Sequence, residues 1–342
     1  MGRPRFAMSN SGSLVAQILP MALAAAILAV AGTVSAGDVS GILQAAQRQF
    51  NAGNYTSSIS TLQSAVTQSP NSAETYYWLG RNYYELRDYD NAISQAEKSV
   101  QLDPKNSLYH QWLGRAYGGK ADREHSFSLA KKVKKEFQQA VQLNPANLQA
   151  RRDLEEYDLD APWIVGGDKD EAKAQVEAIA AVDPVEGHLA RAMMYLEAKK
   201  TDLAENEYRE ALKAKPNRVD PYFEAATFYL RHGKPTDADA AIQAAAQVSS
   251  NDPRLNFYRG VSRVAAGMEQ ARAEEYLKSY LASTPDRSDW PSHAAARDWL
   301  GRLYEAEGKR LEAAEQYRAA LQLEPSRKET RARLQQLEKK SR

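Results

Sequence analysis

Side chains that could do chemistry are scattered through this chain of 342 residues rather than grouped. A catalytic or metal site needs a nucleophile beside a base, a cluster of ligands, or paired carboxylates in a cleft. The sequence has no cysteine, and its five histidines include no pair at helix-face spacing. It also lacks the Gly-x-Ser-x-Gly and His-Glu-x-x-His motifs. We therefore expect a protein that is not an enzyme and that holds no metal or cofactor.

Two stretches imitate ligand-binding loops without completing them. Gly114 is followed by Gly119 and Lys120 at the spacing of a phosphate-binding loop, but Ala121 stands where a Ser or Thr would hold magnesium. No predicted strand precedes this stretch, which such a loop also requires. The aspartates between residues 158 and 170 do not match the spacing of an EF-hand calcium loop. Neither stretch therefore predicts a bound cofactor or metal.

The overall charge gives no sign of a polyanionic partner. The chain has 45 Lys and Arg against 44 Asp and Glu, so no sequence-wide field attracts nucleic acid or anionic lipid. Four lysines within residues 131–135 form a short basic run, and such a run on a helix usually faces solvent. We expect no nucleic-acid partner.

One tetrapeptide, Trp-Leu-Gly-Arg, occurs at residues 78–81, 112–115 and 299–302, and the first two copies lie 34 residues apart. Around each copy, large apolar residues recur at helix spacing, small residues follow, and a proline such as Pro104 or Pro325 comes next. Proline cannot continue a helix interior, so it ends the second helix of a unit. The pattern therefore predicts repeated pairs of helices whose apolar faces pack on each other.

A large residue, Leu-Gly, Tyr, Ala, an aromatic, Ala and Pro over 34 residues resembles the tetratricopeptide repeat. The resemblance implies an all-α fold, a right-handed superhelical solenoid of about eight helix-turn-helix repeats closed by a capping helix at residues 328–342. It covers residues 39–327. The expected units lie near residues 39–72, 73–106, 107–147, 148–184, 185–218, 219–252, 253–287 and 294–327.

The resemblance also implies a protein-binding groove, because the first helices of such repeats line a concave face. Mapping the groove positions onto the first three units gives Gln47, Asn51, Tyr77, Arg81, Tyr84, Gln111 and Arg115. Arginine and tyrosine are common anchors of protein interfaces. In later units the same positions turn apolar, at Leu189, Met193, Leu196, Phe223 and Leu230. That part of the groove suits a partner helix or a second copy of the chain.

Two units depart from the regular length. The third carries about seven surplus residues within residues 118–135, and the fourth carries a surplus at residues 158–169. The second surplus contains Trp163, Ile164 and Val165, which are too apolar for a free surface loop. Either they pack against the helices of their own unit or they form an exposed contact for a partner.

The N-terminus predicts export. Arg3 and Arg5 are the only charges of residues 1–36, an apolar run follows from Leu14 to Val34, and small residues precede a cleavage point after Ala36. This is typical of a signal peptide; the alternative is a membrane anchor formed by residues 14–34 that is not cleaved. Both alternatives place the repeats outside the cytoplasm, with a periplasmic or secreted protein in the first case.

Together these features predict a scaffold that binds a protein or peptide partner through the concave groove. The alternative is a structural subunit of a cell-envelope assembly or polysaccharide-export machine, which a retained membrane anchor would favour. The partner, the pathway and the oligomeric state do not follow from the sequence.

Overall fold

The computed structural model describes residues 36–339, which form seventeen α-helices and one short 3-10 helix, with no strand among them. The α-helices are α1 (Ala36–Asn51), α2 (Tyr55–Gln68), α3 (Ala73–Glu85), α4 (Tyr89–Leu102), α5 (Ser107–Glu124), α6 (Phe127–Leu143), α7 (Leu148–Asp160), α8 (Lys169–Val182), α9 (Pro184–Glu197), α10 (Thr201–Lys213), α11 (Asp220–Arg231), α12 (Pro235–Val248), α13 (Arg254–Ala266), α14 (Gln270–Ser283), α15 (His293–Ala306), α16 (Arg310–Leu323) and α17 (Lys328–Lys339). The 3-10 helix η1 (Trp163–Val165) lies between α7 and α8.

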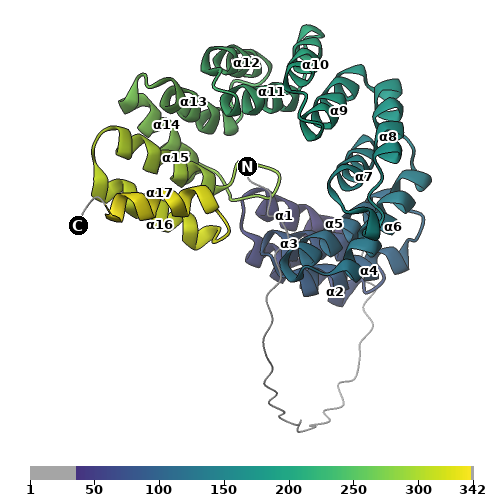
Figure 1. The fold of residues 1–342 in the computed structure, drawn as a ribbon. Coiled ribbons are helices and arrows are strands. Elements are labelled where there is room, and N and C mark those ends of the chain that lie inside the picture. The colour runs from purple at the N-terminus through teal and green to yellow at the C-terminus, as the bar shows by residue number, and fades with distance from the viewer. Residues whose placement is uncertain (1–35, 340–342) are drawn as a thin grey trace.

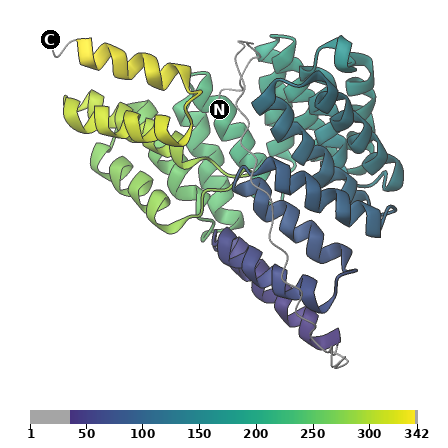
Figure 2. The same ribbon diagram turned by 90° about the horizontal axis from the view of Figure 1, so that it is seen from below.

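Consecutive helices pack as antiparallel pairs that follow one another around a curved array (Figure 1). The odd-numbered helices line the inner side of the curve and the even-numbered helices cover the outside. Figure 2 shows that the two ends are displaced along the axis, so the helices follow a spiral. The predicted fold class, an all-α superhelical array of helix-turn-helix units, is confirmed.

Small residues allow the two helices of a pair to approach closely. A Cβ placed on Gly80 would lie 3.3 Å from the backbone oxygen of Ala92, which itself is fully buried. At Gly114 the added carbon would lie 2.5 Å from the Phe137 ring. At Gly301 it would lie 2.4 Å from the Tyr317 ring. These glycines are therefore needed for packing, because a larger residue would push the paired helix away.

Polar side chains fix where many helices begin. Ser72 accepts a hydrogen bond from the backbone N–H of Thr75 at the start of α3, and Asn147 accepts one from Ala150 at the start of α7. Each such cap satisfies one of the backbone donors that a helix leaves unpaired at its first turn. The turn residues Ser72 and Asn147 thus fix the first turns of α3 and α7.

The two surplus segments have different structures. The first lengthens a helix pair, because α5 has 18 residues and α6 has 17, whereas α3 has 13 and α4 has 14. The second forms the α7–α8 connection with η1 at its centre. Both segments lie at the same part of the array, since η1 packs against α6.

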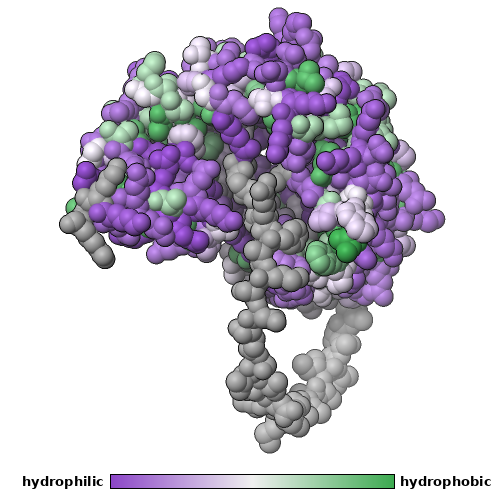
Figure 3. Space-filling view, viewed as in Figure 1, coloured by the Kyte–Doolittle hydropathy of each residue, from purple (hydrophilic) through white to green (hydrophobic). Residues whose placement is uncertain are grey.

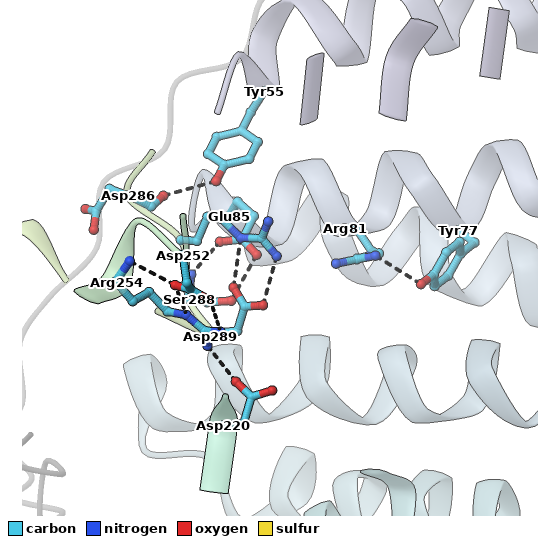
Figure 4. A network of polar contacts seen from close by, with 11 residues as sticks. Tyr55, Tyr77, Arg81, Glu85, Asp220, Asp252, Arg254, Asp286, Ser288 and Asp289 are labelled. Carbon is cyan, nitrogen blue, oxygen red and sulfur yellow. Dashed lines mark hydrogen bonds and ion pairs between the residues drawn. The ribbon is translucent and has the colours of Figure 1, made fainter. Parts of the chain in front are cut away.

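The first turn of the spiral contacts a later segment, residues 284–292, which connects α14 to α15 (Figure 4). The Tyr55 hydroxyl donates to the backbone oxygen of Asp286 at 3.1 Å. The backbone N–H and the hydroxyl of Ser288 donate to the Glu85 carboxylate at 2.8 and 2.9 Å. Pro285 lies against Gly53, where an added Cβ would come within 2.4 Å of it. We call this contact the seam; it was not predicted from the sequence.

The predicted signal peptide or anchor, with its apolar run at residues 14–34, lies outside the described residues. Within residues 36–339, no helix combines the length and apolar character needed to span a bilayer.

Candidate protein-binding face

The three copies of Trp-Leu-Gly-Arg share one arrangement on the inner helices. In each copy the arginine lies over the ring of the tryptophan three residues before it. The guanidinium carbon is 4.7 Å from the ring centre for Arg81 and Trp78, 4.9 Å for Arg115 and Trp112, and 4.6 Å for Arg302 and Trp299. A cation over an indole face is attracted by the ring quadrupole. The half-buried tryptophans are therefore covered partly by their own arginines.

Arg81 is enclosed by aromatic rings from three successive inner helices. Its guanidinium carbon lies 4.6 Å from the ring centre of Phe50 on α1 and 4.4 Å from that of Trp112 on α5. It also donates to the Tyr77 hydroxyl at 3.3 Å. Tyr77 itself is buried, and burial raises the pKa of its hydroxyl. Tyr77 and Arg81, both predicted to bind a partner, thus contribute to packing between the first units.

Gln111 and Arg115 are both bound to Asp153 on α7. The Arg115 guanidinium makes a two-point ion pair with the Asp153 carboxylate at 2.8 and 2.9 Å. The Gln111 amide donates to the same carboxylate at 2.7 Å. Gln111 is almost fully buried, whereas Arg115 remains accessible at its edge. Gln111 and Arg115 are therefore brought together, and Asp153 already occupies part of their hydrogen-bonding capacity.

Further ion pairs connect one inner helix to the next. Arg152 on α7 contacts Glu224 on α11 at 3.1 Å and Glu186 on α9 at 3.7 Å. Arg254 on α13 contacts Asp220 on α11 at 2.6 Å (Figure 4). Single-sequence reasoning missed these residues because their partners lie one or two units away and no motif marks them.

A cleft of about 1000 Å³ opens on the inner side between α3, α5, α6 and α7. Tyr84 and Arg115 from the predicted groove line it, and Ser288 and Asp289 reach it from the seam. Gln47 and Asn51 lie outside it on α1, where the Gln47 amide is 3.5 Å from the Glu74 carboxylate. Of the predicted groove, the cleft therefore includes Tyr84 and Arg115.

Both surplus segments contribute to the lining of this cleft. Gly118 and Val133 come from the lengthened α5 and α6, and Pro162 and Val165 come from the α7–α8 connection. Lys134 joins the two segments, because its ammonium group contacts the Asp158 carboxylate at 3.0 Å and donates to the Gly166 backbone oxygen at 2.5 Å. The surplus residues of the third and fourth units therefore line the same cleft.

Carboxyl groups near the cleft are perturbed by burial. Burial raises the pKa of Asp158 to about 6, despite the adjacent Lys134 ammonium. Burial also raises the pKa of Asp122, which lines the cleft, and the negative charge of Glu156 raises it further. Burial raises the pKa of Glu85 at the seam, although hydrogen bonds from Ser288 lower it. In each case the largest cause of the raised pKa is desolvation of the carboxyl group.

The candidate contact loop separates into a buried and an exposed part. Val165 is 4% exposed and packs inward, while Trp163 is 84% exposed and Ile164 is 53% exposed. The loop is held in place by the Tyr157 hydroxyl, which donates to the Val165 backbone oxygen at 2.9 Å. Figure 3 shows a small hydrophobic patch near α6 and the α7–α8 connection on an otherwise mostly hydrophilic face. Packing within the unit therefore explains the apolar character of Val165, but it does not explain that of Trp163 or Ile164.

The apolar positions expected in the later groove belong largely to the core. Leu189 and Phe223 are buried within the array, and Leu196 and Leu230 pack against the same core. Met193 is half-buried. These residues fill the space between α9, α11 and their neighbours, so they do not form an open apolar surface for a partner helix.

Comparison with protein families places tetratricopeptide repeats in this chain. Models described as tetratricopeptide repeat match residues 73–106, 165–219 and 294–327. The first of these ranges contains the pair α3–α4, and the last covers the pair α15–α16 except for His293. No curated protein sequence matches the chain.

Solved structures show the same kind of fold. A monomeric mutant of IFIT1, solved with m7Gppp-AAAA, covers 85% of this chain and 70% of its own, with 17% identity and a TM-score of 0.54. A tetratricopeptide repeat protein from Parabacteroides merdae covers 78% of this chain and 99% of its own, with 16% identity and a TM-score of 0.49. The TM-score of 0.54 to the IFIT1 mutant supports a shared fold. Because the identity is only 17%, this likeness indicates nothing about the ligands of the present chain.

Proposed function

Because the chain carries tetratricopeptide repeats, which generally serve as protein-interaction scaffolds, we propose that it binds a polypeptide partner on the inner face of its spiral. The observation that carries this proposal is the inner cleft lined by Tyr84 and Arg115. Clefts of such a volume are typical binding sites, and tyrosine and arginine are frequent anchors of interfaces. The exposed Trp163 and Ile164 provide a second contact outside the cleft.

We further propose that binding takes place outside the cytoplasm. The support is the N-terminal pattern of Arg3 and Arg5, the apolar run and the small residues before Gly37. Mass spectrometry of the protein purified from its source cells tests this point. A mature N-terminus at Gly37 supports cleavage and export, whereas a chain that retains residues 1–36 in the soluble cytoplasmic fraction contradicts it.

Site-specific photocrosslinking tests the binding face. A photoreactive phenylalanine analogue replaces Tyr84 in the cleft, Trp163 on the loop, or Leu311 on the outer helix α16, which is 85% exposed. We expect one partner to be crosslinked from Tyr84 in whole cells and absent from Leu311. Crosslinking of the same proteins from both positions, or of none from Tyr84, would contradict a binding role for the inner face. The Trp163 variant shows whether the loop contacts the same partner.

A further inference from the structure

A fully buried carboxyl group lies beside the α7–α8 connection. Asp158 is 1% exposed, and its Oδ1 atom contacts the Lys134 ammonium group at 3.0 Å. Its Oδ2 atom is also buried and has no hydrogen-bond partner in the described part of the chain. Burying a charged oxygen without a hydrogen-bond donor is unfavourable, and a protonated carboxyl group avoids most of this penalty. The surroundings of Asp158 therefore favour its neutral form.

One ammonium group serves two carboxylates and the connection. Lys134 on α6 contacts Glu171, at the start of α8, at 2.8 Å and donates to the Gly166 backbone oxygen at 2.5 Å. The negative charges of Glu171 and of Asp168, which caps the first turn of α8, also act on Asp158. When all three carboxyl groups are ionised, the one ammonium group does not balance them. Closing the connection thus brings like charges together around a buried group.

The connection covers this cluster through contacts that can separate without disturbing a helix pair. The Gly166 oxygen accepts from Lys134, the Val165 oxygen accepts from the Tyr157 hydroxyl at 2.9 Å, and η1 packs against α6. Lys134 and Asp158 belong to α6 and α7, which contact each other directly, so they stay close when the connection lifts away. Opening therefore gives water to Asp158 and leaves its cation in place.

The two forms of the connection consequently bind a proton with different strength. In the closed form, burial raises the pKa of Asp158 from 3.8 to about 6, despite the adjacent Lys134. In an open form the carboxyl group is hydrated and still beside an ammonium group, so its pKa returns to its ordinary value or below. The closed form is therefore favoured most below about pH 4, and this advantage is lost as pH rises to about 6.

We propose that Asp158 is the proton-binding group of a pH-sensitive switch that fixes the α7–α8 connection in acid and releases it toward neutral pH. The switch acts on Trp163 and Ile164, which the connection holds at the surface. Its use in partner binding rests on the proposed function, because it regulates the exposed contact outside the cleft.

A single buried thiol measures the opening. The chain has no cysteine, so Val165→Cys supplies one thiol at a position that is 4% exposed. The rate at which it reacts with 4,4′-dithiodipyridine in the mature chain, divided by the rate of a cysteine peptide at the same pH, reports the open fraction. We expect this ratio to rise at least about tenfold between pH 4 and pH 7. A ratio that stays constant or falls overturns the switch.

Two further substitutions in the Val165→Cys chain identify the proton-binding group. Asp158→Asn has no carboxyl group to titrate, so the ratio should stay low at every pH. Glu171→Gln changes a side chain that is 49% exposed and leaves Lys134 to Asp158 alone, so the rise should be smaller. An undiminished rise in either variant overturns the role of Asp158 and assigns the titration to another group, such as His125 in the neighbouring cleft.

A matched control removes a carboxylate elsewhere. Asp202→Asn eliminates an exposed charge on the outer helix α10 and should leave the rise unchanged. Circular dichroism between pH 4 and pH 7 confirms that every variant remains helical.

The two proposals can fail separately. If the ratio depends on pH but no partner is crosslinked from position 163, the switch stands and its use in binding is wrong. If the ratio is constant while a partner is crosslinked from that position, the switch is overturned and the proposed function stands.

Discussion

At the residue scale, each position of Trp-Leu-Gly-Arg has a separate physical role. The leucine is buried, as Leu79, Leu113 and Leu300 are all at most 4% exposed. The glycine allows the paired helix to approach, and the arginine covers the tryptophan of its own copy. The tetrapeptide recurs because one local geometry is needed in three places, so its recurrence reports packing rather than ligand binding.

Because aromatic rings enclose Arg81, replacing it by lysine should lower the free energy of unfolding. Arg81→Lys keeps the charge but loses the planar group that lies against Phe50, Trp78 and Trp112. We expect a loss of about 1 kcal/mol, seen as a lower midpoint of urea unfolding. Arg310→Lys, at an exposed position on the outer helix α16, should leave the midpoint unchanged. Equal midpoints for all three proteins would show that the aromatic enclosure adds no stability.

A buried histidine predicts how stability depends on pH. The His110 ring lies 2.7 Å from the Glu136 carboxylate and 3.1 Å from the Pro104 backbone oxygen, and the hydrogen bond to Glu136 raises its pKa. Its stabilising effect is therefore complete below about pH 6.5, the ordinary value for histidine, and is lost as pH rises through the higher folded-state value. Thermal melts should show wild type losing stability above about pH 6.5 more steeply than His110→Gln. Parallel curves would contradict this assignment.

At the element scale, the helices could be predicted from the sequence because each pair is a local unit. Tyr76, Leu79 and Tyr83 mark one face of a helix, and proline and turn residues mark the helix ends. The all-α array could therefore be predicted without knowledge of contacts between residues distant in the sequence. The cleft was not predictable in this way. The surplus around Gly118 and the surplus around Trp163 are visible in the sequence, but only the folded structure shows that residues of both line one cleft.

The same limit applies to the predicted groove residues. Arg115 was chosen for its place on the first helix of its unit, while its partner Asp153 lies 38 positions further along. A single sequence gives no sign of this pairing, so it could not show which groove residues are already bound. Tyr84 and Arg115 enter the cleft, whereas Gln47 and Asn51 do not line it.

Two glycines on α5 predict opposite effects of the same substitution. Gly114→Ala would place a methyl group 2.5 Å from the Phe137 ring, so we expect a loss of about 1–3 kcal/mol from overpacking. Gly118→Ala has open space beside it and should gain about 0.5–1 kcal/mol from helix propensity. Urea unfolding of the two variants beside wild type provides the measurement. A gain at Gly114 or a comparable loss at Gly118 would contradict the packing of α5 on α6.

At the scale of the whole molecule, curvature and closure depend on different contacts. Ion pairs between inner helices, such as Arg152 with Glu224, tie units that are two apart and favour a tight spiral. The seam then joins α2 and α3 to residues 284–292. Because the seam also supplies Ser288 and Asp289 to the cleft, its closure completes the candidate binding site.

The seam predicts that a small change opens the spiral without unfolding it. Glu85→Ala with Ser288→Ala removes both hydrogen bonds between these residues, at 2.8 and 2.9 Å, while leaving every helix pair intact. Hydrogen bonds to a charged acceptor contribute about 1.5–3 kcal/mol, and less where they are exposed to water as Ser288 is, so their loss should shift the population toward open forms.

The absence of native cysteine makes the opening measurable, because spin labels can be attached at Thr56→Cys on α2 and Ser283→Cys at the end of α14. We expect one narrow distance distribution in the otherwise wild-type chain and a broader, longer one in the double variant. Thr61→Ala removes a hydrogen bond inside the first unit, 2.9 Å to Gln49, and should leave the distribution narrow. A narrow distribution in the double variant would mean that the remaining contacts, which include Pro285 against Gly53, Tyr55 with Asp286 and Arg287 over the Phe50 ring, are sufficient to hold the seam. A broad one would mean that Glu85 and Ser288 control access to the cleft, since the same opening moves Ser288 and Asp289 away from Tyr84.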